Sequence, residues 1–237
     1  MSYDNYEVID GEYSVAEQTR TFFANVYRYM FLALAVSGVT AFVSADTGWY
    51  IDLVTNADGS INGMYYVLIF APVAIVLFLQ ARINKLSFGQ AIGIYLLYSV
   101  VIGISLSFIF FAFNLGAIAL TFFITAGTFG AMALIGYTTK VDLSKMGSLL
   151  YMVFIGMFIA SIVNIWIGSD TMGWIISFLG LFVFTGLTAW EMQRLKKVAQ
   201  EPRISDDLRR KHELIGGLTL YILFINLFLT ILRFVDR

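Results

Sequence analysis

The sequence contains no cysteine, one histidine and two prolines among its 237 residues. Without cysteine, the chain cannot form a disulfide, perform thiol catalysis or bind a metal through thiolates. His212 is the single histidine and lies in a charged stretch, so we expect neither a histidine-rich metal site nor a Ser-His-Asp triad inside the membrane. The serine, threonine and acidic residues lack a neighbouring base, and no glycine loop that could cradle a phosphate is present. We therefore expect no enzymatic activity and no bound cofactor.

Charged residues are also scarce. They make up 13% of the chain, whereas about 25% is usual for a soluble domain. The net charge of −1 and the lack of a basic run with interleaved aromatic residues argue against nucleic-acid binding. Hydrophobic residues reach 59%, which leaves too few charges to cover the surface of a soluble globule. The composition predicts a protein whose main partner is the lipid bilayer.

Seven apolar stretches are each long enough to cross a bilayer, which takes about 20 residues. They predict an all-α integral membrane protein with one transmembrane domain over residues 21–237. Residues 1–20 are acidic and lack the features of a signal peptide, so we expect a polar cytosolic tail there. The expected spans lie near 24–45, 62–81, 89–112, 115–137, 147–167, 172–191 and 214–235.

The charge of the loops predicts the orientation, because cytoplasmic loops collect lysine and arginine. Basic residues occur in loops 81–88, 138–146 and 192–213, whereas the alternate loops have none. The N-terminus is therefore expected in the cytoplasm and His212 in a solvated cytoplasmic loop. Arg233 runs against this rule, since seven spans place the C-terminus outside.

Glu191 closes the sixth apolar stretch and is the most informative ionisable residue near membrane depth, where charges are costly. In one interpretation it is an interfacial carboxylate that pairs with Arg194, three residues further along the same helix. In the other it is a partly buried, titratable acid whose partner, Arg82, comes from another helix. Burial favours a protonated carboxylate and a nearby guanidinium favours an ionised one. Protonation would then break the pair and loosen the bundle.

The last apolar stretch carries a stripe at helical spacing: Thr219, Leu223, Asn226 and Thr230. Such a stripe should face protein or water rather than lipid, which makes it a candidate pore lining. Leu223 interrupts the polar character, and hydrogen bonds to neighbouring helices would explain the stripe without a pore. Pro72, in the second stretch, is interpreted as a tolerated bend, with a hinge as the alternative.

Residues 128–144, 187–196 and 218–228 resemble the Bax-inhibitor-like family of seven-helix membrane proteins. The resemblance extends from about residue 20 to the C-terminus and is closest to the bacterial branch. It implies a bacterial inner membrane and a fold in which six helices pack around a central C-terminal helix. It also implies a pH-sensitive calcium leak, in which two acids share a proton and an arginine latches the closed state.

The resemblance assigns these roles to three positions in this sequence. The acid on helix six corresponds to Glu191, which then serves as gate, proton sensor and candidate calcium ligand. The arginine latch on helix two corresponds to Arg82. The second acid corresponds to Leu223, which cannot titrate. Its loss removes the coupling between two carboxylates and one of the oxygen ligands that calcium prefers.

Two functions follow as alternatives. The first is a pH-sensitive leak channel for calcium or another cation, gated by Glu191. The second is a non-conducting, stress-protective regulator that binds other membrane proteins or a membrane protease, which the leucine at position 223 favours. A secondary transporter is a weaker third option, because only one span contains a proline and paired interrupted spans are absent.

Overall fold

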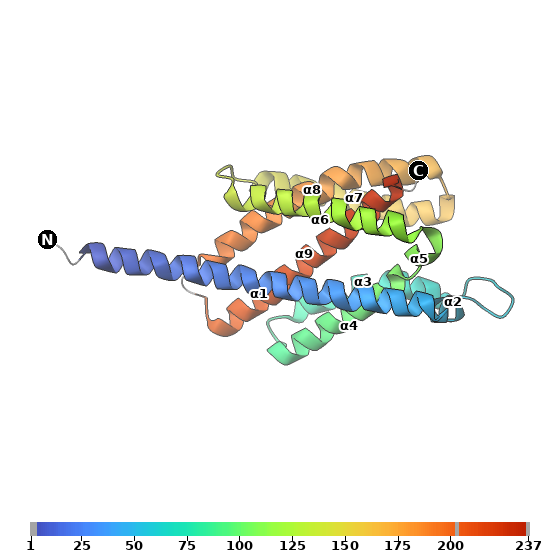
Figure 1. Cartoon of the computed structure of the whole chain (residues 1–237), viewed down its shortest axis with the longest axis horizontal. Helices are drawn as coiled ribbons and strands as arrows, with labels where there is room; N and C mark the ends of the chain where they lie inside the picture. The colour runs from blue at the N-terminus through green and yellow to red at the C-terminus, as the bar shows by residue number, and fades with distance from the viewer. Residues whose placement is uncertain (1–3, 202–203, 236–237) are drawn as a thin grey trace. The chain divides into compact units, whose positions relative to one another are not determined.

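The computed structural model describes residues 4–201 and 204–235, with side chains from residue 15 onward. This part of the chain is helical and contains no strand, which confirms the all-α class. A lone antiparallel bridge between Thr55 and Ile61 closes the first loop. The helices are α1 (Asp4–Asp46), α2 (Trp49–Val54), α3 (Gly63–Arg82), α4 (Phe88–Leu106), α5 (Ile109–Ala112), α6 (Leu115–Thr138), α7 (Ser144–Ile167), α8 (Asp170–Ala199) and α9 (Asp206–Val235) (Figure 1).

Seven helical segments are long and apolar enough to cross a membrane, as expected. Helices α4 and α5 together form the third of them, Phe88–Ala112. The last segment, in α9, is the most buried: 67% of its apolar window is inside the protein, against 6–39% for the other six. Such burial is what the expected central position of the C-terminal helix requires.

The helices extend beyond the apolar stretches at several ends. Helix α1 begins at Asp4, so most of the expected 1–20 tail is helical and continuous with the first span. Helix α8 continues to Ala199 and α9 begins at Asp206, which shortens the expected 192–213 loop. His212 consequently lies in α9 and is half-buried, so the expectation of a solvated loop histidine was wrong. Hydropathy identifies only the apolar part of a helix. An existing helix can extend into polar residues, because each residue added to its end adds one backbone hydrogen bond.

The third span is interrupted, a feature that its uniform hydropathy does not reveal. Ser107 and Phe108 form a turn between α4 and α5, and the Ser107 hydroxyl donates to the Gly103 carbonyl at 3.3 Å. Helix α3, by contrast, runs without interruption through the buried Pro72. A hinge at that proline stays a prediction.

The chain divides into two compact units, and α9 contributes residues to both. The first comprises Met1–Asn114 and Ala199–Leu218. In this unit α1 lies beside α4 (Figure 1). The Tyr95 hydroxyl of α4 donates to the Tyr29 carbonyl of α1 at 2.6 Å. Gly103 lets the two helices approach, since a Cβ there would lie 2.6 Å from the Ser37 carbonyl oxygen.

The second unit comprises Leu115–Val198 and Thr219–Arg237. It contains α6, α7, most of α8 and the second half of α9. Gly136 of α6 packs directly on the backbone of Ala189 in α8, where no side chain would fit. Phe224 of α9 packs edge-on against Phe129 of α6, with ring centroids 5.5 Å apart. Helix α8 of this unit carries Glu191, which is buried.

Candidate functional site

Glu191 is completely buried, with 0% of its surface exposed. Both of its carboxylate oxygens accept hydrogen bonds from Arg194, which lies three residues further along α8. Nε of Arg194 donates to Oε2 at 2.8 Å, and Nη2 donates to Oε1 at 2.6 Å. A bidentate, charge-assisted pair of this kind is among the strongest hydrogen-bonded contacts in proteins. The pairing with Arg194 is therefore the arrangement that the structure contains.

The Glu191–Arg194 pair borders the contact between α8 and α7. The guanidinium of Arg194 lies 5.6 Å from the centroid of the Trp190 ring, within the range of a cation–π interaction. Trp190 in turn packs edge-on against Tyr151 of α7, with centroids 5.3 Å apart. It also covers Gly147 of α7, where a Cβ would collide with the indole. The position of Arg194 is thus linked to helix packing through Trp190.

Gln193 joins α8 to the loop between α6 and α7. Its Oε1 accepts the Leu143 N–H at 2.8 Å, and its Nε2 donates to the Val141 carbonyl at 2.7 Å. Sequence reasoning missed this contact. The available signal was the row of long polar side chains that follows Glu191 on α8.

Two lysines of α8 contact the end of α6 and the loop that follows it. Lys196 donates to the Tyr137 carbonyl at 3.0 Å and lies 4.8 Å from that ring's centroid. Lys197 forms an ion pair with Asp142 at 3.1 Å. Hydrogen bonds from Ser144 and Lys197 lower the pKa of the Asp142 carboxyl to about 2. The Asp142 carboxyl therefore stays ionised near neutral pH.

Arg82, the expected latch, is the last residue of α3 and is exposed. It belongs to the first unit, whereas Glu191 belongs to the second. The pairing of Arg82 with Glu191 therefore stays a prediction, and it would require Arg194 to share or release the carboxylate.

The four stripe residues on α9 divide into two pairs. Asn226 and Thr230 line a cavity in the second unit, and Thr219 and Leu223 are not among its lining residues. The Asn226 amide donates to the Ile222 carbonyl at 2.8 Å, and the Thr230 hydroxyl donates to the Asn226 carbonyl at 2.7 Å. These two donors thus satisfy their own helix rather than a neighbouring one. Leu223 is buried, with 6% exposed.

A sequence model of the family described as "Inhibitor of apoptosis-promoting Bax1" matches residues 19–237. The chain belongs to the Bax inhibitor-like family. It is 41% identical to the inner membrane protein YbhL of Escherichia coli K12, over 90% of each chain. A protein of Borreliella burgdorferi is 36% identical over 91% of each chain, and one of Rickettsia prowazekii is 35% identical over 93% of this chain and 91% of its own. With its seven apolar helices, this family member is an integral membrane protein.

The described residues of this Bax inhibitor-like protein contain no group of three or more histidine, aspartate or glutamate side chains that could hold a metal ion. Both oxygens of Glu191 face Arg194. The role of Glu191 as a calcium ligand stays a prediction, and it requires Arg194 to move away first.

Glu213 is a second buried carboxylate, to which the sequence interpretation gave no role. It lies on α9 in the first unit and is 4% exposed. It accepts a hydrogen bond from the Asn25 amide of α1 at 3.1 Å, and Arg28, Arg209 and Arg210 attract it electrostatically. The available signal was its spacing of four residues from Gly217. In the structure, a Cβ added at Gly217 would lie 2.7 Å from the Cβ of Tyr29, so α9 and α1 approach closely here.

Proposed function

We propose that the protein is a pH-sensitive leak channel for calcium or another cation, closed while Glu191 is ionised and paired with Arg194. The observation that carries the proposal is the completely buried carboxylate held by a bidentate arginine beside the α7–α8 contact. The name of the Escherichia coli relative supports a location in a bacterial inner membrane. The basic loops support a cytoplasmic N-terminus.

Protonation of Glu191 removes the negative charge that holds Arg194 in place. The Arg194 side chain is 43% exposed, so its freed guanidinium can turn toward water. Trp190 then loses the cation that lies over its ring, and its packing on Gly147 and Tyr151 is weakened. In this mechanism acid loosens the α7–α8 contact and increases the leak.

Calcium efflux from liposomes tests this mechanism across mildly acidic to mildly basic pH. Wild type is expected to leak faster in acid. Glu191→Gln cannot form the ion pair, so its efflux should be high and independent of pH. Glu201→Gln is a matched control, because Glu201 is an exposed acid beyond the end of α8. Equal and pH-independent efflux from wild type and Glu191→Gln would remove the gate assignment.

A second candidate function is a non-conducting regulator that binds other membrane proteins or a membrane protease. Leu223 favours it, because a buried leucine replaces the second acid that the family resemblance implies at that position. If this function holds, purified wild type releases no calcium at any pH and Leu223→Asp restores a leak. A wild-type leak that responds to pH would contradict it.

A further inference from the structure

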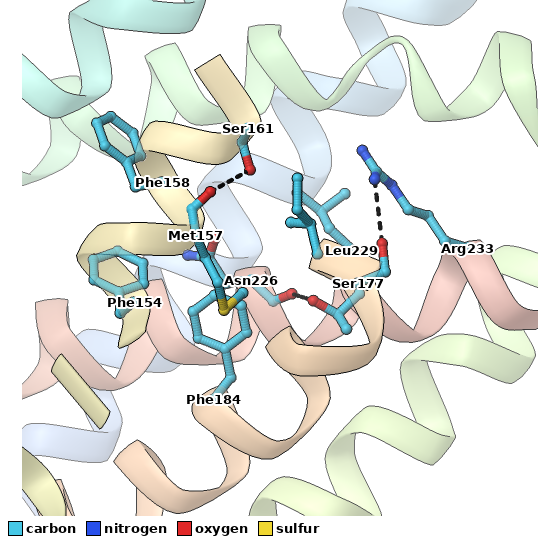
Figure 2. A pocket seen from close by; sticks show the side chains of 11 residues that line it. Phe154, Met157, Phe158, Ser161, Ser177, Phe184, Asn226, Leu229 and Arg233 are labelled. Atoms are coloured by element: carbon cyan, nitrogen blue, oxygen red, sulfur yellow. Dashed lines mark hydrogen bonds between the residues drawn. The ribbon is translucent and has the colours of Figure 1, made fainter. Parts of the chain in front are cut away.

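A cavity of about 190 Å³ lies between α7, α8 and the second half of α9, within the second unit (Figure 2). Its walls include the rings of Phe154 and Phe158 from α7 and Phe184 from α8. Apolar cavities of ~150 Å³ can bind benzene. The space is therefore large enough for a segment of hydrocarbon chain.

Three polar side chains that line this cavity donate a hydrogen bond to a carbonyl of their own helix. The Ser161 hydroxyl donates to the Met157 carbonyl at 2.9 Å (Figure 2). The Asn226 amide and the Thr230 hydroxyl also donate to carbonyls of their own helix. Six of the eleven lining residues are apolar: Phe154, Met157, Phe158, Ile176, Phe184 and Leu229. The interior thus offers mainly apolar surface.

Arg233 provides the cationic group of this cavity. It is exposed near the end of α9, and its Nη1 donates to the Ser177 hydroxyl at 3.2 Å (Figure 2). This is the one hydrogen bond that it makes to the described residues, whereas a guanidinium carries five N–H donors. Its positive charge opposes the entry of a cation and favours an anion.

The lining and the charge together define an amphiphilic ligand. We propose that this cavity binds a segment of one acyl chain of an anionic phospholipid from the outer leaflet, with the lipid phosphate on Arg233. This location rests on the proposed cytoplasmic N-terminus, which together with seven spans puts this end of α9 on the outer side. Arginine suits a phosphate because its planar fork can donate two parallel hydrogen bonds. The site also accounts for a basic residue where the orientation rule disfavours one.

Lipid retention by the purified full-length protein tests the proposal by native mass spectrometry. Phosphatidylglycerol is compared with phosphatidylcholine of identical acyl chains, because the two share a phosphate but differ in net charge. Wild type should retain one phosphatidylglycerol more tightly than phosphatidylcholine. Arg233→Gln should lower phosphatidylglycerol affinity about tenfold, the effect of losing a charge-assisted hydrogen bond, and Arg233→Lys should lose less. Lys145→Gln, at the other end of α7, is the matched control and should bind as wild type.

Three outcomes overturn the proposal. Equal retention of both lipids by wild type would remove the role of Arg233 in headgroup selection. Displacement of the lipid by inorganic phosphate alone at similar concentration would show an anion site without a chain pocket. Unchanged binding after Ser161→Phe, which fills the cavity, would place the chain elsewhere. If Ser161→Phe does not fold, the comparison of Arg233→Gln with Arg233→Lys still tests the proposal. None of these measurements depends on calcium efflux.

Discussion

The two buried carboxylates of this protein are held in opposite ways. Glu191 receives two hydrogen bonds from a guanidinium on its own helix, three residues away. Glu213 receives one from the neutral amide of Asn25, 188 residues away in sequence on α1. The first pair therefore depends on the local geometry of α8, and the second depends on the packing of α1 against α9.

Because the two carboxylates have different partners, we expect neutralisation of Glu191 and of Glu213 to have different effects. Neutralising Glu191 is expected to release its cationic partner Arg194, which lies over the Trp190 ring beside α7. Neutralising Glu213 releases no direct ionic partner, because its amide donor can still bond to a protonated acid. We therefore expect the loss of charge to disturb the α7–α8 contact at the first site and to leave the hydrogen bond between α1 and α9 in place at the second.

The largest effect is expected when Arg194 is removed and Glu191 is kept. Arg194→Met leaves an ionised carboxylate buried without its partner, which costs about 3 kcal/mol. At about 2–4 °C for each kcal/mol in a chain of this size, the Tm should fall by about 6–12 °C at mildly basic pH. Acid or the added change Glu191→Gln should restore most of it. Thermal unfolding in detergent, followed by tryptophan fluorescence, measures the shift.

The control for this variant is Arg20→Met, which removes an exposed arginine of α1. It should leave the Tm close to that of wild type. An equal loss of stability for Arg194→Met at acidic and basic pH would show that packing of the arginine stem, and not the charge of Glu191, is responsible.

An intermediate effect is expected when the amide partner of Glu213 is removed. Asn25→Ala should destabilise the protein by about 1–3 kcal/mol, the cost of leaving a buried polar group without its bond. The positive charges of Arg28, Arg209 and Arg210 still attract Glu213 and reduce this loss of stability. Hydrogen exchange should increase in α1 around residues 22–33 but remain unchanged in α7. Gln200→Ala, an exposed side chain, is the control, and faster exchange in α7 as well would contradict a local role.

The smallest effect is expected from Glu213→Gln. The amide oxygen of glutamine still accepts the Asn25 hydrogen bond, so the stability should change by less than about 1 kcal/mol. Glu191→Gln should cost more, because it replaces two charge-assisted bonds. Parallel thermal unfolding of the two variants measures the difference, and a larger loss for Glu213→Gln would reverse the comparison of the two sites.

Several features could be predicted because they depend on local sequence. Each span was found from its run of apolar residues, and the three-residue spacing of Glu191 and Arg194 offered their pairing as one of two interpretations. Other features could not be predicted. The helical residues between 4 and 20, the turn at Ser107 and the burial of His212 arise from helix propagation and packing, which hydropathy does not measure.

Contacts between helices could not be predicted either, because hydropathy does not show which helices pack together. The bond between Asn25 and Glu213 and the loop contact of Gln193 join residues that are far apart in the chain. The cavity bordered by Arg233 is formed by three helices, and no single stretch of sequence shows that they leave a space.

The sequence by itself determined that this chain is a helical membrane protein with seven spans, since backbone groups in lipid must bond within their own segment. Only the tertiary structure decided which acid is paired with a charge, which with an amide, and where a cavity remains. Those outcomes depend on which side chains are brought together by helices that are distant in sequence. Hydropathy does not identify these contacts between helices.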